Sequence, residues 1–92
     1  MITSEKNIER MLVDAITRKN GLCIKLLSDY VTGLPDRLCL LPEQRVVFVE
    51  LKSTGRKPRK IQKFIHNKLK ALGFRVEVID TADGVSKLVE NL

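Results

Sequence analysis

Apolar residues recur with two different periods along the chain, and the change of period divides it into helical and extended segments. Between residues 4 and 19 they return every three or four positions, which predicts an amphipathic helix. Its apolar stripe comprises Ile8, Met11, Leu12, Ala15 and Ile16. Thr3 or Ser4 is suited to cap the start of this helix, and Asn20-Gly21 is suited to end it.

Short apolar runs bounded by turn residues predict four strands. These strands span residues 22–28, 36–41, 45–53 and 74–79. Residues 32–35 have the composition of a turn. Residues 42–44 are few enough to join the second and third strands as an antiparallel hairpin.

Two further helices complete the predicted order of elements, α-β-β-β-α-β-α. One spans residues 60–72 and ends at Gly73, and it is expected to turn Ile61, Phe64, Ile65, Leu69 and Leu72 inward. The last begins near Asp83-Gly84, with Val85, Leu88, Val89 and Leu92 on one face. Because a helix separates the third and fourth strands, we expect these to be parallel with a right-handed crossover. The sequence predicts one α/β domain over residues 1–92, with a mixed four-stranded sheet flanked by helices.

Two charges interrupt the apolar third strand. Side chains in a strand alternate between faces, so Glu50 and Lys52 emerge on one face. The neighbouring residues are apolar on both faces: Val46 and Phe48 on the side of the charges, and Val47, Val49 and Leu51 on the other. A strand of this kind is usually central in its sheet. Charges at such a place are costly unless they are paired or hold a metal.

Asp36 supplies a second carboxylate, fourteen residues before Glu50. Mg²⁺ and Mn²⁺ prefer six oxygen ligands and usually keep several waters, so Asp36, Glu50 and the backbone carbonyl of Leu51 suffice as protein ligands. Lys52 could orient or deprotonate the attacking water, or neutralise developing charge. This is the chemistry of a metal-dependent phosphodiesterase. The alternative is that Asp36 is a turn residue and that Glu50 and Lys52 form a simple ion pair, which leaves both charges on a central strand unexplained.

Three more side chains are candidates for the site. Glu5 falls within the angular range of the apolar stripe of the first helix, so it is expected to lean toward the core. The alternative is a first-turn carboxylate that is stabilised by the helix dipole. Glu9, nearer the edge of the stripe, is the weaker candidate for the same role. Gln62 could reach a phosphate or a metal-bound water. His66 has no visible partner and is expected on the surface.

Positive charge is concentrated beside the predicted active strand. The formal net charge is +6, and residues 52–70 contain eight Lys or Arg and no Asp or Glu. This run is either a solvated basic face or a phosphate-binding surface, and its place next to the strand favours the latter. The predicted DNA contacts are Lys25, Arg37, Arg56, Lys57, Arg59, Lys60 and Lys63. Aromatic residues are too few for base stacking to dominate.

The cysteines indicate a reducing compartment. Cys23 and Cys39 lie in separate apolar runs without a CxxC spacing, which makes a zinc site improbable and two buried free thiols the expectation. The sequence shows neither a signal peptide nor an apolar stretch near 18 residues, so no membrane association is expected. These features predict a cytoplasmic protein.

Three groups of residues together resemble the VRR-NUC family of the PD-(D/E)xK nuclease superfamily, in its minimal phage-encoded form. They are Gly33-Leu34-Pro35-Asp36-Arg37, Phe48-Val49-Glu50-Leu51-Lys52 and Gln62. Glu5 with Ile8 is similar to the leading Glu-x-x-Ile of that family. The resemblance implies a restriction-endonuclease-like core and a Mg²⁺ or Mn²⁺ cofactor. It also implies that Asp36, Glu50 and Lys52 are catalytic, with Glu5 and Gln62 as helpers.

The resemblance further implies a structure-selective DNA endonuclease that acts on branched DNA. Standalone members look like homodimers that resolve four-way junctions, and two symmetric cuts do need two sites related by a two-fold axis. The cell would be a bacterium or a phage-infected host. The open alternatives are a flap, duplex-nicking or RNA nuclease, and a basic DNA-binding module without catalysis. The final helix and the strand near Cys23 are both candidates for the dimer surface.

Overall fold

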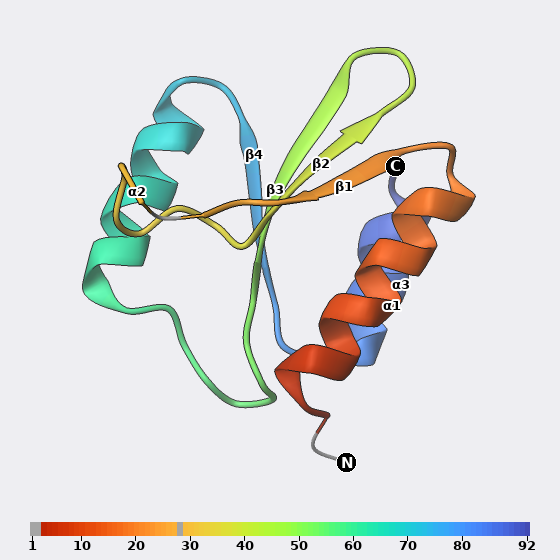
Figure 1. The fold of residues 1–92 in the computed structure, drawn as a ribbon, viewed down its shortest axis with the longest axis horizontal. Coiled ribbons are helices and arrows are strands. Elements are labelled where there is room, and N and C mark those ends of the chain that lie inside the picture. Colours follow the sequence, from red (N-terminus) through yellow and green to blue (C-terminus); the bar gives the residue numbers. More distant parts are fainter. Residues whose placement is uncertain (1–2, 28) are drawn as a thin grey trace.

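The computed structural model describes residues 3–27 and 29–92. Its elements are α1 (Glu5–Arg18), β1 (Leu22–Lys25), β2 (Arg37–Leu41), β3 (Arg45–Leu51), α2 (Lys60–Ala71), β4 (Arg75–Ile79) and α3 (Ala82–Glu90) (Figure 1). This confirms the predicted order α-β-β-β-α-β-α. The first strand is shorter than predicted, because it ends at Lys25. The last residue of its predicted span, residue 28, lies outside the described residues.

The four strands form one mixed sheet in the order β1-β2-β3-β4. β1 and β2, and β2 and β3, pair antiparallel, whereas β3 and β4 pair parallel across the helix α2. β3 therefore lies between two neighbours, as its apolar character on both faces predicted. β3 ends at Leu51, two residues earlier than predicted, so it carries Glu50, while Lys52 follows directly after it.

One face of the sheet is covered by α1 and α3, which lie side by side (Figure 1). Every fourth residue of α1 points at the sheet, and Ile8, Leu12 and Ile16 are fully buried there. They meet the alternate residues Val47, Val49 and Leu51 of β3 in the main hydrophobic core. The helix begins where predicted, because the Ser4 side chain accepts a hydrogen bond from the Asn7 N–H at 3.2 Å. Among the predicted stripe, Met11 is the exception and is exposed.

The opposite face of the sheet is covered by α2 in an unexpected orientation. The buried residues of this helix are Gln62 and His66. Ile61, Phe64 and Leu72, which were expected to turn inward, are exposed. That part of the prediction is wrong, because α2 packs over the part of the sheet that carries a buried carboxylate. A polar partner there is worth more than an apolar one.

Gly33 brings the segment before β2 into close contact with α2. Its φ is +93°, and a Cβ atom at this position would lie only 2.6 Å from the carbonyl oxygen of Ile61. Only glycine fits both conditions. The close approach fixes the path of the chain from Gly33 to Asp36, so that it arrives beside the end of β3.

The basic loop between β3 and α2 is attached to the end of β4. Thr54 donates its hydroxyl to the Asp80 carbonyl at 2.8 Å, and the Gly55 N–H donates to the Asp80 carboxylate at 3.0 Å. The Thr3 N–H in turn donates to the Thr54 hydroxyl oxygen at 3.0 Å. These bonds hold the loop next to the carboxyl end of β3. Among the described residues, no helix combines the length and the apolar character that crossing a bilayer requires.

We predict that Leu12→Ala lowers the free energy of unfolding by about 2–5 kcal/mol, because it leaves a cavity in the core between α1 and β3. Urea denaturation followed by circular dichroism measures this change. Met11→Ala on the exposed side of α1 is the matched control and should cost about 1 kcal/mol or less. Equal losses for the two variants would contradict the orientation of α1.

Candidate active site

Glu50 is the centre of the candidate site. Its side chain is only 1% exposed, next to the carboxyl end of β3. Oε2 accepts a hydrogen bond from Gln62 Nε2 at 2.8 Å and lies 3.1 Å from Lys52 Nζ. The Gln62 amide oxygen accepts from the Arg59 N–H at 2.8 Å, which fixes the amide orientation at the start of α2. The structure thus brings together three of the predicted site residues.

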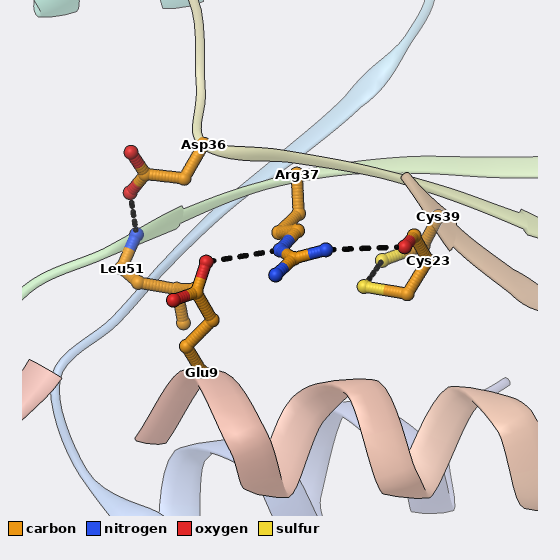
Figure 2. A network of polar contacts seen from close by, with 6 residues as sticks. All are labelled: Glu9, Cys23, Asp36, Arg37, Cys39 and Leu51. Carbon is orange, nitrogen blue, oxygen red and sulfur yellow. Dashed lines mark hydrogen bonds and ion pairs between the residues drawn. The ribbon is translucent and has the colours of Figure 1, made fainter. Parts of the chain in front are cut away.

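Asp36 lies immediately before β2 and is bound to β3 through the backbone. Its Oδ2 accepts a hydrogen bond from the Leu51 N–H at 2.8 Å (Figure 2). The next residue, Lys52, donates its N–H to Ile79 of β4 instead. Because the backbone groups of successive strand residues face opposite edges, the carbonyl of Leu51 faces the same edge as its N–H, toward Asp36. Asp36 and this carbonyl therefore lie together beside the Glu50 strand.

The electrostatic environment disfavours a charged Glu50. Burial raises the pKa of its carboxyl group, and the nearby carboxylate of Asp36 raises it further. The Lys52 ammonium opposes both effects by hydrogen bonding and by its charge, and Glu5 adds a smaller increase to the pKa. Two further carboxylates thus raise the cost of a charge on Glu50 at this end of the sheet. A site of this kind binds a cation favourably, because the cation relieves the mutual repulsion.

His66 is buried and faces Glu50, so its expected place on the surface is wrong. Only 4% of the residue is exposed, and Nε2 lies 3.8 Å from Glu50 Oε1. Burial lowers the pKa of the ring, and the nearby Lys70 and Lys52 lower it as well, whereas the Asp36 carboxylate opposes them and raises it. The sequence did contain a signal, because residues four apart share a helix face and Gln62 precedes His66 by four.

The two acidic candidates on α1 take different places. Glu5 is exposed, so the expectation that it leans toward the core is wrong, although its charge still acts on Glu50. Glu9 forms an ion pair with Arg37 Nε at 3.0 Å (Figure 2). Of these two candidates, only Glu9 forms an ion pair among the described residues.

Most of the predicted DNA-contacting side chains are accessible. Exposed positions include Lys25 at the end of β1 and, near the start of α2, Arg56, Lys57, Arg59, Lys60 and Lys63. Arg37 differs from them, because its side chain is only 16% exposed. It donates to Glu9 and, at 3.2 Å, to the Cys23 carbonyl (Figure 2). We therefore leave Arg37 out of the DNA-binding surface proposed below.

The two cysteines are neighbours rather than isolated residues. Cys23 and Cys39 face one another across β1 and β2, with their Sγ atoms 3.8 Å apart (Figure 2). Both are free thiols, but only Cys39 is buried, whereas Cys23 is half-buried. They lie beside the Arg37–Glu9 pair and contact the hydrophobic core between α1 and the sheet.

The donor set suits a hard divalent cation. Within residues 3–27 and 29–92, no cluster of three or more His, Cys, Asp or Glu side chains forms a metal cage. The protein oxygens would instead be the two carboxylates of Asp36 and Glu50 with the Leu51 carbonyl, and Mg²⁺ is often bound with so few protein ligands. Glu50 Oε1 is buried without a hydrogen-bond partner, which is the state expected of an oxygen that a cation completes.

Known proteins share both the sequence and the fold. The chain is 40% identical over 79 residues to "Putative nuclease p44" of Acyrthosiphon pisum secondary endosymbiont phage 1, which covers 86% of this chain and 85% of that protein. A solved structure described as a "VRR_NUC domain" superposes with a TM-score of 0.88 and 28% identity, over 96% of this chain and 97% of the other. A comparison with models of known families finds none that matches.

The fold is that of an α/β domain of the VRR_NUC type, since the superposition covers nearly all of both chains. With the identity to the phage protein, the chain belongs to the VRR-NUC family of nucleases. The resemblance inferred from residues 33–37 and 48–52 is thereby confirmed, together with the predicted fold class.

We predict that Glu50→Gln stabilises the metal-free protein at pH 7. Because the pKa of Glu50 is raised in the folded state, the free energy of unfolding falls as the pH rises from the ordinary value of 4.5 through the folded pKa. The cost of ionising the buried carboxylate therefore opposes folding at neutral pH. The melting temperature of Glu50→Gln in EDTA should exceed that of the wild type by a few degrees at pH 7, and this gain should vanish near pH 4.

Glu77→Gln is the matched control for this measurement, since Glu77 lies on β4 with 38% of its side chain exposed. Its substitution should not produce a gain that depends on pH in this way. A Glu50→Gln protein that melts below the wild type at pH 7 but not at pH 4 would contradict the raised pKa.

Proposed function

We propose that the protein is a metal-dependent DNA endonuclease that hydrolyses phosphodiester bonds in branched DNA. The observation that carries the proposal is the buried Glu50, whose Oε2 is held by Lys52 and Gln62 while Oε1 is left without a partner. Burying a charged strand residue in this way opposes folding, as its raised pKa indicates. A functional requirement accounts for keeping it.

Each residue of the site has a role in this proposal. Asp36, Glu50 and the Leu51 carbonyl would hold one Mg²⁺ or Mn²⁺, which supplies a Lewis acid for the phosphodiester and an activated water. Lys52 orients that water or neutralises charge that develops on the phosphate. Gln62 keeps Glu50 in position. Glu5 contributes negative charge from α1 at the rim of the site.

The basic loop is the proposed contact with the DNA backbone. Arg56, Lys57 and Arg59 lie in this loop, Lys60 and Lys63 lie at the start of α2, and all five residues are exposed. Lys25 lies at the end of β1, opposite Arg37 in the sheet register. Contacts of this kind position the enzyme on phosphates without reading sequence, so selectivity would come from the shape of the DNA.

We also propose that the protein acts as a homodimer on four-way junctions, in the cytoplasm of a bacterium or phage-infected cell. The apolar face of α3 is an improbable dimer surface, because Val85 and Leu88 are buried in the core. The other candidate is supported better: Leu22 on β1, beside Cys23, is 60% exposed. One domain of 92 residues provides one active site, and paired cuts require two.

We predict that Glu50→Gln and Asp36→Asn abolish cleavage while sparing the fold and DNA affinity. Each removes a charged ligand from the proposed cation site, so we expect turnover to fall at least about a hundredfold. The assay uses a labelled four-way junction with matched flap, nicked and linear duplex substrates, in Mg²⁺, Mn²⁺ or EDTA. Paired cuts confined to the junction would support the dimeric resolvase.

Glu77→Gln is again the matched control and should cleave as the wild type does. Cutting mainly at flaps or in duplex DNA would keep the nuclease but remove junction resolution. Full activity of either active-site variant would rule out the proposed site. Binding without cutting of any substrate, by a folded wild type, would favour the basic binding module.

We predict that replacing Arg56, Lys57 and Lys60 by Gln weakens DNA binding broadly rather than slowing the chemical step. Each lost phosphate contact reduces the dependence of log affinity on log salt by about 0.9. Fluorescence anisotropy on junction DNA at several salt concentrations measures the slope, and saturating single-turnover kinetics measure the cleavage rate. A changed rate with an unchanged salt slope would place the loop in the catalytic apparatus instead.

A further inference from the structure

Two buried polar atoms face one another in the site and neither has a hydrogen bond. They are Glu50 Oε1 and His66 Nε2, which are 3.8 Å apart. Among the buried side-chain nitrogen and oxygen atoms of the described residues, these two lack a hydrogen-bond partner. Buried polar groups of this kind are almost always paired in native proteins. Two that face each other therefore indicate an interaction that forms in the working protein.

The orientation of α2 indicates that the contact between His66 and Glu50 has a function. The helix carries Ile61 and Phe64, yet these are 40% and 55% exposed, while Gln62 and His66 are buried. Rotating the helix would bury more apolar surface, so the observed orientation sacrifices hydrophobic stabilisation. What it gains is a pair of polar side chains, one turn apart, that both face Glu50.

We infer that His66 is a positioning residue for Glu50, whose Nε2–H donates to Oε1 and fixes the carboxylate for the cation. This inference rests on the proposed function. A neutral imidazole with the proton on Nε2 is a donor at that atom. The two atoms need to approach by about 1 Å to reach ordinary hydrogen-bond length.

The lone pairs of Glu50 show why this contact suits a metal ligand. A carboxylate offers about four lone-pair sites, two on each oxygen. Gln62 and Lys52 occupy both sites on Oε2. A bond from His66 would occupy one site on Oε1 and leave the other for the cation. Gln62 and His66 together would then prevent the carboxylate from rotating.

His66→Gln and His66→Leu separate positioning from simple packing. Glutamine can place an amide N–H near the position of Nε2, whereas leucine fills a similar volume without a donor, and both favour helices. The readout is the affinity of the metal-free protein for Mn²⁺, followed by electron paramagnetic resonance without DNA. We expect His66→Leu to bind Mn²⁺ at least about tenfold more weakly, as loss of such supporting contacts typically does, and His66→Gln to stay within about threefold.

Asn67→Leu, at the exposed next position of α2, is the matched control and should bind Mn²⁺ normally. Wild-type affinity in a folded His66→Leu protein, or equal loss in both His66 variants, would overturn the inference. Glu50→Gln is titrated in parallel. If it lost Mn²⁺ while His66→Leu did not, the metal site would stand and only the role of His66 would fail. If Glu50→Gln bound Mn²⁺ normally, both would fail.

A second measurement needs neither a variant nor the metal. The chain contains one histidine, so its ring nitrogens can be assigned without ambiguity in a long-range ¹H–¹⁵N spectrum. At pH 8 we expect the proton on Nε2, protected from exchange with water. A ring that carries its proton on the other nitrogen has no donor toward Glu50 and would overturn the inference, even if His66→Leu failed to fold.

Discussion

The burial of one carboxylate, Glu50, on the central strand is the constraint on which the arrangement of the rest depends. A carboxylate at 1% exposure must be surrounded by donors, and the structure supplies Lys52, directly after the last residue of β3, and Gln62 from α2. This demand explains why α2 turns a polar side to the sheet and leaves apolar side chains in solvent. It also explains why the opposite face, where α1 and α3 pack on alternate residues of β3, has to provide the hydrophobic core. One face of β3 thus packs in the hydrophobic core, and the other face carries the proposed catalytic carboxylate.

A second constraint, backbone geometry, holds the carboxylates together. The Asp36 carboxylate accepts a hydrogen bond from the Leu51 N–H, at the point where β2 begins. That bond is available because β3 continues beyond the end of its pairing with β2, while β4 still pairs with it on the other edge. Gly33 allows the preceding chain to pass against α2, so the approach to Asp36 is fixed as well. The site is therefore a consequence of where strands end.

Local patterns in the sequence were sufficient for the elements and for the central constellation. In an extended chain, the alternation of side chains places Glu50 and Lys52 on one face. The crossover through a helix makes β3 and β4 parallel. The misjudged residues depend on tertiary contacts instead. The amphipathic pattern of α2 predicted that Ile61 and Phe64 face inward. This prediction is wrong because the pattern contains no information about the carboxylate on the sheet surface that the helix covers. The Glu9–Arg37 pair joins α1 to β2 across 28 positions, a separation at which a single sequence offers no signal.

His66 shows how such an error in α2 conceals a functional residue. A histidine without an adjacent partner in the sequence is most often on the surface, and this absence of a partner is the reason that His66 is expected there. In the observed orientation, α2 turns toward Glu50 the face that carries Gln62. Because residues four apart share a helix face, His66 lies against the same carboxylate. A buried carboxylate needs more than one fixed donor to keep a single orientation, since a single bond leaves it free to rotate about that contact. The polar side of α2 is therefore best understood as a support for Glu50, with the apolar residues of the helix left exposed as its consequence.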